Sequence, residues 1–305
     1  MKTVFMFSGQ GAQYAGMGKN LYKNYPVAKE IFDRADNVLG YSIKDICFED
    51  EQKLGETEFA QPAILTMSIA AMKVLEEEGV RADMTAGLSL GEYCAIAVAG
   101  GMCDLDAIRT VRSRGIFMEH AAPEGSGAMS AVLGMDAEVI EDVLNGREGV
   151  SIANYNCPGQ IVITGEAAAV AEAGTALKEA GARRVLPLKV SGPFHSPMMR
   201  PAGEELAKVF AGVSMNPLKI PYVANINAEV ITDCGRIEGL LVEQVSGSVR
   251  WQQSVETMIR EGVDTFVEIG PGKTLTGFLR KIDKNVKAYH IGSWEEAVQV
   301  CEELK

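Results

Sequence analysis

The segment Gly87-Leu88-Ser89-Leu90-Gly91, followed by Glu92-Tyr93, has the Gly-x-Ser-x-Gly form of a nucleophile elbow. In such an elbow a strand turns sharply into a helix, and glycines flank the serine because no side chain fits beside the strained turn. Residues 81–86 predict a short strand, and residues 92–99 predict a helix of small residues that Gly100-Gly101 end. The start of that helix would aim backbone N–H groups at the serine, where they stabilise an oxyanion. The alternative is an ordinary strand-to-helix turn with a capping serine.

The composition is typical of a globular protein with a large core. Of the 305 residues, 47% are hydrophobic and 23% are charged, and this length allows one large domain or two smaller ones. The formal net charge of -12 argues against nucleic acid and an anionic membrane surface as partners. The apolar run at residues 3–7 is too short for a signal peptide and predicts a first core strand. No membrane span is predicted.

The cysteines lie far apart in the sequence, without a CxxC pair or a Cys/His cluster. The sequence therefore predicts neither a zinc site nor a disulfide framework. We expect a reducing, cytoplasmic setting and no metal. The six cysteines are Cys47, Cys94, Cys103, Cys157, Cys234 and Cys301.

Apolar runs alternate with helical patterns through the first 120 residues of the chain. A strand is predicted at 3–7, and helices are predicted at 27–39, 61–78 and 104–120. This alternation indicates an α/β architecture with a mainly parallel sheet.

A different rhythm, strand-helix-strand-strand-helix-strand, begins near Gly125 and is typical of a ferredoxin-like unit. The larger domain then resumes with strands at 220–224 and 265–269 and a glycine-rich turn at 270–273 that opens a helix. Two lobes usually enclose a cleft between them. The inserted unit has predicted strands at 128–133, 150–155, 160–164 and 183–190 and predicted helices at 137–144 and 167–180.

A neutral serine needs a neighbouring base, most often histidine, to accept its proton. Of the three histidines, His120 ends a helix and His290 lies in an apolar run, so both are predicted to be structural. His195 lies in the irregular loop 190–197, where the insert returns to the main domain, and is the best candidate base. The alternative is a hydrogen-bonded structural histidine. A third group has to orient the imidazole of the base, and no acid between Ser89 and His195 stands out for this role. A backbone carbonyl or an amide can orient the imidazole instead.

The loop Ser8-Gly9-Gln10-Gly11-Ala12-Gln13-Tyr14 follows the first predicted strand. It does not match the dinucleotide-binding pattern, because Tyr14 stands where that pattern needs glycine. Two glycines would let the backbone approach a reacting group, with the amide of Gln10 as an oxyanion donor beside that of Leu90. The alternative is an ordinary turn between strand and helix.

Arg109, Arg112 and Arg114 lie close together on the predicted helix 104–120 but do not share one face. Arg114 is therefore free to point away from Arg112. If it points inward, its buried guanidinium needs an anion, and a substrate carboxylate matches its two-pronged geometry.

Five motifs span the chain in the order Phe7-Ser8-Gly9-Gln10-Gly11-Ala12-Gln13, Gly87-Leu88-Ser89-Leu90-Gly91-Glu92-Tyr93, Arg114, Gly192-Pro193-Phe194-His195-Ser196 and Glu268-Ile269-Gly270-Pro271-Gly272. Together they resemble the malonyl-CoA:acyl carrier protein transacylases of fatty acid synthesis. The resemblance covers essentially all 305 residues. It implies an α/β-hydrolase-like large subdomain at residues 1–125 and 191–305, with a mainly parallel sheet, and an inserted ferredoxin-like subdomain at residues 126–190.

The resemblance also implies a mechanism. Ser89 would attack the thioester carbonyl of malonyl-CoA with His195 as base, and the backbone amides of Gln10 and Leu90 would hold the oxyanion. The malonyl group would then pass from Ser89 to the phosphopantetheine thiol of an acyl carrier protein. Coenzyme A and phosphopantetheine are substrates in this scheme, and no cofactor is bound. Arg114 would pair with the malonyl carboxylate.

Four further positions take roles from the same resemblance. Phe194 corresponds to the malonyl-selective form of the histidine loop. The main-chain carbonyl of Arg250 would orient His195, and Gln61 and Asn156 would line the substrate cleft.

The chain departs from the family pattern at three positions: the family commonly has histidine at Leu88, proline at Ser8 and often glutamine at Arg250. We expect the chemistry to survive the first change, because the base is His195.

Carrier proteins are acidic, so an enzyme with a net charge of -12 needs a local basic surface to bind one. The candidate basic rim consists of Lys273, Arg280, Lys281 and Lys284, with Arg183 and Arg184 across the cleft. Two other functions stay open: a serine thioesterase that uses water as the acceptor, and a catalytically silent carrier-binding protein. Arg114 argues against the first, and the intact pair of Ser89 and His195 argues against the second.

Overall fold

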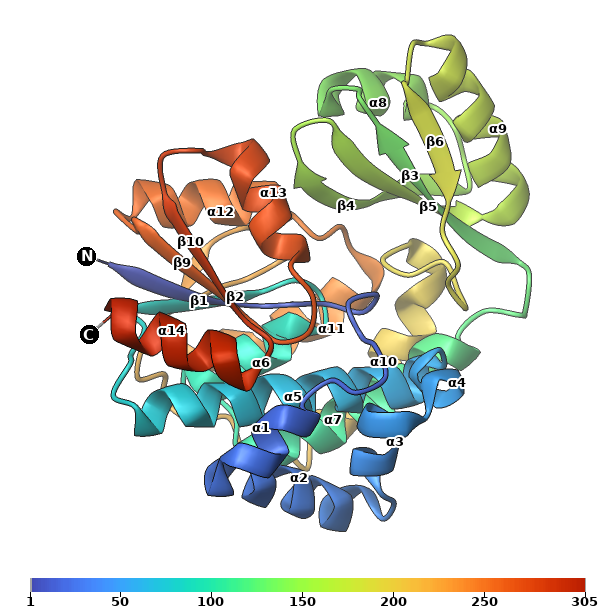
Figure 1. The fold of residues 1–305 in the computed structure, drawn as a ribbon. Helices are drawn as coiled ribbons and strands as arrows, with labels where there is room; N and C mark the ends of the chain where they lie inside the picture. Colours follow the sequence, from blue (N-terminus) through green and yellow to red (C-terminus); the bar gives the residue numbers. More distant parts are fainter. Residues whose placement is uncertain (1, 305) are drawn as a thin grey trace.

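The large lobe is built on a sheet with strand order β10-β9-β1-β2-β7-β8. A computed structural model describes residues 2–304 (Figure 1). All neighbouring strands in this sheet are parallel except β7 and β8, which are antiparallel. Its strands are β1 (Thr3–Phe7), β2 (Met84–Gly87), β7 (Tyr222–Val223), β8 (Val230–Ile231), β9 (Thr265–Ile269) and β10 (Lys287–Ile291). The predicted α/β class with a mainly parallel sheet is confirmed.

Helices connect and follow these strands. In chain order they are α1 (Lys19–Asn24), α2 (Pro26–Leu39), α3 (Ile43–Glu49), α4 (Glu51–Leu54), α5 (Thr57–Glu77), α6 (Gly91–Val98), α7 (Asp104–His120), η1 (Pro197–Met199), α10 (Arg200–Phe210), η2 (Cys234–Arg236), α11 (Ile237–Ser246), α12 (Trp251–Arg260), α13 (Thr274–Ile282) and α14 (Trp294–Leu304). The predicted helix at 104–120 has the bounds of α7.

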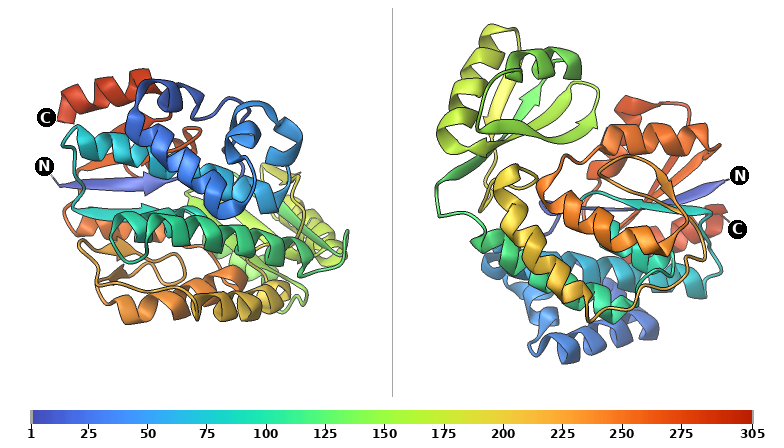
Figure 2. Two further views of the ribbon diagram at one scale, coloured as in Figure 1. Left: turned by 90° about the horizontal axis from the view of Figure 1, so that it is seen from below. Right: turned by 180° about the vertical axis from the view of Figure 1, so that it is seen from behind.

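Both faces of β1 are buried, because its side chains alternate between two hydrophobic clusters. Phe5 and Phe7 pack in the cluster that contains residues of α5 and α6. Val4 and Met6 pack in the cluster that contains residues of α12 and α13. Helices accordingly lie on both sides of the sheet in Figure 2.

Residues 127–187 form a second lobe with its own core and an antiparallel sheet of order β4-β5-β3-β6 (Figure 1). This is the strand order of a ferredoxin-like unit. Its elements are β3 (Gly127–Leu133), α8 (Ala137–Leu144), β4 (Val150–Cys157), β5 (Gln160–Glu166), α9 (Ala167–Glu179) and β6 (Arg184–Pro187). We propose that the insert extends from residue 126 to residue 190.

The strand predicted at 183–190 is too long. β6 ends at Pro187, whose partner on β3 is Ser130. Apolar residues at 188 and 190 continue the alternating pattern that is typical of a strand. Both side chains, Leu188 and Val190, are nevertheless exposed, and they lie on the segment that leaves the sheet. The chain has to leave the sheet here in order to return to the large lobe.

Helix α5 begins at Thr57, earlier than the predicted residue 61, although Pro62 lies inside it. Proline has no N–H group to donate to the carbonyl of Glu58, four residues earlier. Arg112 replaces that donor: its Nη1 atom lies 2.9 Å from the Glu58 carbonyl oxygen and 2.6 Å from its carboxylate. Within residues 2–304, no helix combines the length and the apolar character needed to cross a membrane.

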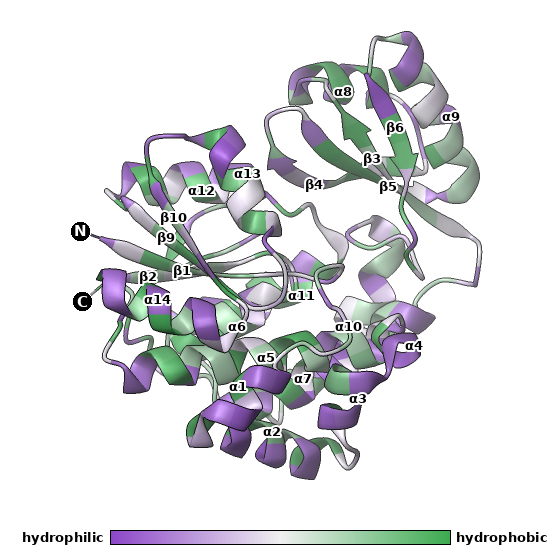
Figure 3. Cartoon of the chain, viewed as in Figure 1, coloured by the Kyte–Doolittle hydropathy of each residue, from purple (hydrophilic) through white to green (hydrophobic). Residues whose placement is uncertain are grey.

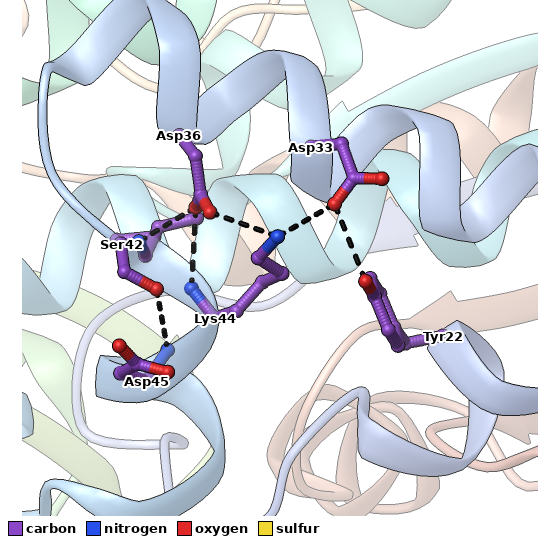
Figure 4. Close-up of polar contacts among 7 residues, drawn as sticks. Tyr22, Asp33, Asp36, Ser42, Lys44 and Asp45 are labelled. Atoms are coloured by element: carbon purple, nitrogen blue, oxygen red, sulfur yellow. Dashed lines mark hydrogen bonds and ion pairs between the residues drawn. The ribbon is translucent and has the colours of Figure 1, made fainter.

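A polar cluster joins α2 to α3 on the outside of the large lobe (Figure 4). The Lys44 ammonium lies 2.6 Å from Asp33 and 3.0 Å from Asp36. Asp36 also accepts the backbone N–H of Ile43 at 2.8 Å, at the start of α3. Figure 3 shows hydrophilic residues concentrated on these outer helices, so the cluster belongs to the solvated surface rather than to the cleft.

Candidate active site

The turn between β2 and α6 has the geometry of a nucleophile elbow. Ser89 has a φ of 53°, in the left-handed region that non-glycine residues rarely adopt. A Cβ on Gly87 would lie 2.0 Å from the backbone of Gly91, and a Cβ on Gly91 would lie 2.1 Å from the carbonyl oxygen of Phe7. Both glycines are therefore required by close backbone contacts, as the sequence pattern predicts.

His195 is the histidine that reaches the elbow. Its Nε2 atom lies 2.8 Å from Oγ of Ser89, and its Nδ1 atom lies 2.9 Å from the carbonyl oxygen of Gln244. A carbonyl only accepts, so Nδ1 carries the proton and Nε2 is left to accept one from serine. Burial, with a further effect of the Arg114 charge, lowers the pKa of His195 to about 4. The imidazole is therefore a neutral base at physiological pH.

The other two histidines lie outside the elbow. His120 is exposed at the end of α7. His290 lies 3.2 Å from the carbonyl oxygen of Gly270 and 3.0 Å from the carboxylate of Glu296.

The prediction that the carbonyl of Arg250 orients His195 is wrong. That carbonyl accepts from the backbone N–H and the hydroxyl of Ser254, both at 2.9 Å, at the start of α12. Gln244 supplies the orienting carbonyl instead. It lies in the last turn of α11, where carbonyl groups have no partner within the helix and remain available.

Arg114 points into the protein, away from its neighbours on α7, and is 1% exposed. Nη1 donates to Oε1 of Gln61 at 2.9 Å, and Nη2 donates to Oγ of Ser89 at 3.0 Å and to Oε1 of Gln244 at 3.1 Å. Within residues 2–304, no carboxylate lies within 4.0 Å of it. The site therefore holds a buried guanidinium with neutral partners beside the serine, and burial lowers the pKa of this group.

Gln10 and Leu90, the two predicted oxyanion donors, line the same cavity. Gln10 follows β1, and Leu90 directly precedes α6. Neither backbone N–H donates to an acceptor within residues 2–304, and both residues line the cavity in front of Ser89. The side chain of Gln10 donates to the hydroxyl of Thr57 at 3.1 Å, which steadies this loop. The two amides are thus available for an oxyanion.

A cavity of about 360 Å³ lies in front of Ser89, between the two lobes. Backbone hydrogen bonds link the two lobes. The N–H of Val249 donates to the carbonyl of Ala153, and the carbonyl of Val249 accepts from the N–H of Tyr155, both on β4. The remaining predicted wall residues, Gln61, Asn156 and Phe194, all line this cavity, as does Leu88. Other lining residues are Met118 from α7, Met129, Asn154 and Val162 from the small lobe, Leu188, Val190 and Ser191 from the connecting segment, and Leu275 and Phe278 from α13.

Three residues of the site were not predicted from the sequence. Asn225 accepts the backbone N–H of Ser89 at 2.6 Å and donates to the carbonyl of Gly87 at 2.7 Å. The side chain of Gln244 donates to the carbonyl of Ser89 at 2.9 Å and to the buried carboxyl of Glu92 at 2.6 Å. For Glu92, an acid inside a helix of small apolar residues was an available signal. Asn225 and Gln244 have no local signal.

The candidate basic rim is partly engaged in other contacts. Lys273 pairs with Glu296 at 2.7 Å, and the ammonium of Lys281 donates to Gln160 of the small lobe at 3.3 Å. Its role in binding a carrier stays a prediction.

The fold and the site define an enzyme of the serine-dependent acyl-transfer class. A family model described as the acyl transferase domain matches residues 4–299. The malonyl CoA-acyl carrier protein transacylase of Bacillus subtilis (strain 168) is 45% identical over 309 residues, which cover 100% of this chain and 98% of that protein.

Solved structures agree with this assignment. The MCAT of Streptococcus pneumoniae is 46% identical with a TM-score of 0.95, and the match covers 99% of this chain and 100% of that one. A malonyl-transacylase solved in complex with a type II PKS acyl-carrier protein is 38% identical with a TM-score of 0.95, over 99% of this chain and 100% of that one. The chain therefore belongs to the malonyl CoA-acyl carrier protein transacylases, and the resemblance drawn from its motifs is confirmed.

Proposed function

We propose that this chain transfers the malonyl group of malonyl-CoA to the phosphopantetheine thiol of an acyl carrier protein through an ester on Ser89. The observation that carries the proposal is the Arg114 guanidinium. It is buried, has no carboxylate partner among the described residues, and donates to the nucleophile itself at 3.0 Å. A thioesterase for uncharged acyl groups has no need of such a group, whereas a malonyl thioester brings a carboxylate to fill it.

The first half-reaction forms the acyl-enzyme. Oγ of Ser89 attacks the thioester carbonyl while its proton passes to Nε2 of His195, 2.8 Å away. The backbone N–H groups of Gln10 and Leu90 donate to the oxyanion of the tetrahedral intermediate. The carbon–sulfur bond then breaks, and His195 returns the proton to the departing thiolate of coenzyme A.

The second half-reaction reverses these steps with a different thiol. The phosphopantetheine thiol gives its proton to His195, and its sulfur attacks the ester carbonyl on Ser89. The carbon–oxygen bond breaks, and the serine oxygen takes the proton back. Because both halves use the same groups, the enzyme alternates between two thiols in one site.

We expect substrate choice to follow from three residues that line the cavity, Arg114, Phe194 and Asn156. Arg114 holds the free carboxylate, and Gln61 accepts from its Nη1 atom at 2.9 Å. Phe194 lies beside the base and, together with Asn156 of the small lobe, bounds the space next to the acyl group. We propose that Phe194 leaves room for a malonyl group but disfavours branched ones.

The acceptor, the pathway and the setting belong to the same proposal. Similarity to the Bacillus subtilis protein along the whole chain supports an acyl carrier protein of fatty acid synthesis as acceptor, and a carrier of polyketide synthesis is the alternative. We propose that coenzyme A and phosphopantetheine are the only carriers involved and that no resident cofactor takes part. Six free cysteines support a cytoplasmic setting.

One experiment tests the proposal. The protein is incubated with malonyl-CoA, analysed by mass spectrometry for a malonyl adduct on Ser89, and then supplied with a phosphopantetheinylated carrier. We expect the adduct to form and to pass to the carrier, and the Ser89→Ala variant to form none. Rapid release of free malonate in place of transfer would establish hydrolysis. A wild-type protein without any adduct would establish the silent carrier-binding protein.

A further inference from the structure

A buried carboxyl group lies directly behind the elbow. Glu92 is in the first turn of α6 and is 1% exposed. Its Oε2 atom accepts from Nε2 of Gln244 at 2.6 Å and from the backbone N–H of Asn225 at 3.2 Å, whereas Oε1 has no partner within residues 2–304. The proposed mechanism does not use this acid, although burying it is costly.

The side-chain amide of Gln244 connects Glu92 to Arg114. Its nitrogen donates to Glu92, and also to the carbonyl of Ser89 at 2.9 Å. Its oxygen therefore faces Arg114 and accepts from Nη2 at 3.1 Å. If the amide were turned over, its N–H groups would oppose those of the guanidinium and its oxygen would oppose that of Glu92. The Glu92 carboxyl and the Ser89 carbonyl thus bind the amide nitrogen of Gln244, and this leaves its oxygen directed at Arg114.

The partners of Arg114 are then neutral oxygens, from Gln61, Gln244 and the hydroxyl of Ser89. A carboxylate in direct contact would form an ion pair and would compete with a substrate carboxylate for the same N–H groups. An amide between the acid and the arginine orients the guanidinium without neutralising it.

The protonation state of Glu92 does not alter this argument. Burial raises its pKa to about 8, against the opposing effects of the hydrogen bonds from Gln244 and Asn225 and of the Arg114 charge. A carboxyl oxygen accepts hydrogen bonds in both the ionised and the protonated form.

We propose that Glu92 is a positioning residue for substrate selection, which acts through Gln244 to keep the Arg114 guanidinium oriented and open to a substrate carboxylate. This inference rests on the proposed function, and it adds a residue that contacts neither the acyl group nor the reacting atoms. It predicts that a change at Glu92 alters the preference for malonyl over acetyl, rather than the rate alone.

The test compares Glu92→Leu with the matched variant Glu92→Gln in single-turnover acylation of Ser89 by malonyl-CoA and acetyl-CoA. Leucine has a similar size but no acceptor, whereas glutamine keeps an oxygen for Gln244. For Glu92→Leu we expect the malonyl-to-acetyl ratio of kcat/KM to fall roughly 10-fold, through a higher KM for malonyl-CoA. For Glu92→Gln we expect the ratio to stay within about threefold of that of the wild type.

Two outcomes overturn the proposal. An unchanged ratio in Glu92→Leu would mean that the acid only supports the fold, and an equal loss in Glu92→Gln would mean that its charge acts instead. If Glu92→Leu does not fold, Gln244→Leu removes the same contact to Arg114 while the orienting carbonyl remains. We then expect the same loss of the ratio, and an unchanged ratio would refute the inference. Failure of the proposed function itself would look different, because the wild type would form no malonyl ester.

Discussion

The Arg114 guanidinium and the Ser89 hydroxyl share a hydrogen bond of 3.0 Å, so the group that we propose to bind the substrate carboxylate touches the nucleophile. In a malonyl thioester a single methylene separates the carboxylate from the reacting carbonyl. A carboxylate held by Arg114 therefore brings that carbonyl next to Oγ of Ser89. The same contact that selects a malonyl group thus also positions its thioester carbonyl for attack.

The first prediction concerns Arg114→Ala. Removing the guanidinium should lower kcat/KM for malonyl-CoA by roughly 100-fold, because a charge-assisted pair of hydrogen bonds is lost from a buried site. Acylation by acetyl-CoA should fall much less, since acetyl has no carboxylate. Parallel stopped-flow measurements with the two substrates check this. Unchanged selectivity would mean that Arg114 has only a structural role.

The second prediction concerns pH. Nε2 of His195 accepts a proton only when neutral, and its pKa is lowered to about 4. Acylation should therefore lose less than about twofold between pH 8 and pH 5, whereas a histidine with the usual pKa of about 6.5 would lose roughly 30-fold. A pH profile of single-turnover acylation checks this, and a midpoint near the usual value would contradict it.

The same shift has a consequence for stability. Because the folded pKa lies below the unfolded one, the unfolded chain binds more protons between pH 4 and pH 6.5. The contribution of His195 is fully present above this window and is lost as the pH falls through it, by about 3 kcal/mol in total. Unfolding free energies of the wild type and His195→Asn, measured in urea from pH 7 to pH 5, should therefore differ in slope.

The elbow could be predicted from the sequence because its Gly-x-Ser-x-Gly pattern is local. Gly87 is fixed by the backbone of Gly91 inside the turn, and Gly91 is fixed by the carbonyl of Phe7 on β1. The strands and helices around them follow from apolar periodicity. His195 could be selected because the sequence contains few histidines and this one lies in a loop between the two lobes.

The support of the site could not be predicted in the same way. Asn225 and Gln244 reach Ser89 from positions 136 and 155 residues further along the chain. Only the packing of α11 and the loop after β7 against the elbow brings them there. The error at Arg250 has the same origin. Every residue has a backbone carbonyl, so the sequence does not show which carbonyl accepts from Nδ1 of His195. That choice depends on where α11 ends.

A third prediction tests the close contacts of the elbow. In Gly91→Ala the new methyl group would meet the carbonyl of Phe7 on the central strand, a backbone group that cannot move aside. We expect a loss of more than about 3 kcal/mol of unfolding free energy, or failure to fold. Gly239→Ala is the matched control, since nothing lies within 4 Å of its Cβ position in α11. This control should be neutral or stabilising by up to about 1 kcal/mol in urea unfolding.

A fourth prediction concerns the cluster between α2 and α3 (Figure 4). Asp36→Ala removes both the acceptor for the backbone N–H of Ile43 and a partner of Lys44, so it should cost about 1 to 2 kcal/mol. Glu30→Ala breaks a pair with Arg34 that is largely exposed and should cost less than about 0.5 kcal/mol. Thermal and urea unfolding of both variants check this, and equal losses would contradict the assigned role of Asp36.

The last prediction concerns the acidic carrier. The double charge reversal Arg280→Glu/Lys281→Glu on α13 should raise the KM for the carrier at least about fivefold at low salt, because like charges would then meet on the proposed basic rim. The KM for malonyl-CoA should change by less than about twofold, since Ser89 and Arg114 are unaltered.

The matched control is Lys23→Glu/Lys29→Glu, on α1 and α2 far from α13 in Figure 1. Each double variant moves the net charge from -12 to -16, because each reversal subtracts two. A general effect of net charge would therefore raise the KM for the carrier equally in both variants, and that result would reject the rim. A local docking surface predicts a rise in the α13 variant alone, and added salt should reduce the difference because screening weakens the contact in the unaltered protein.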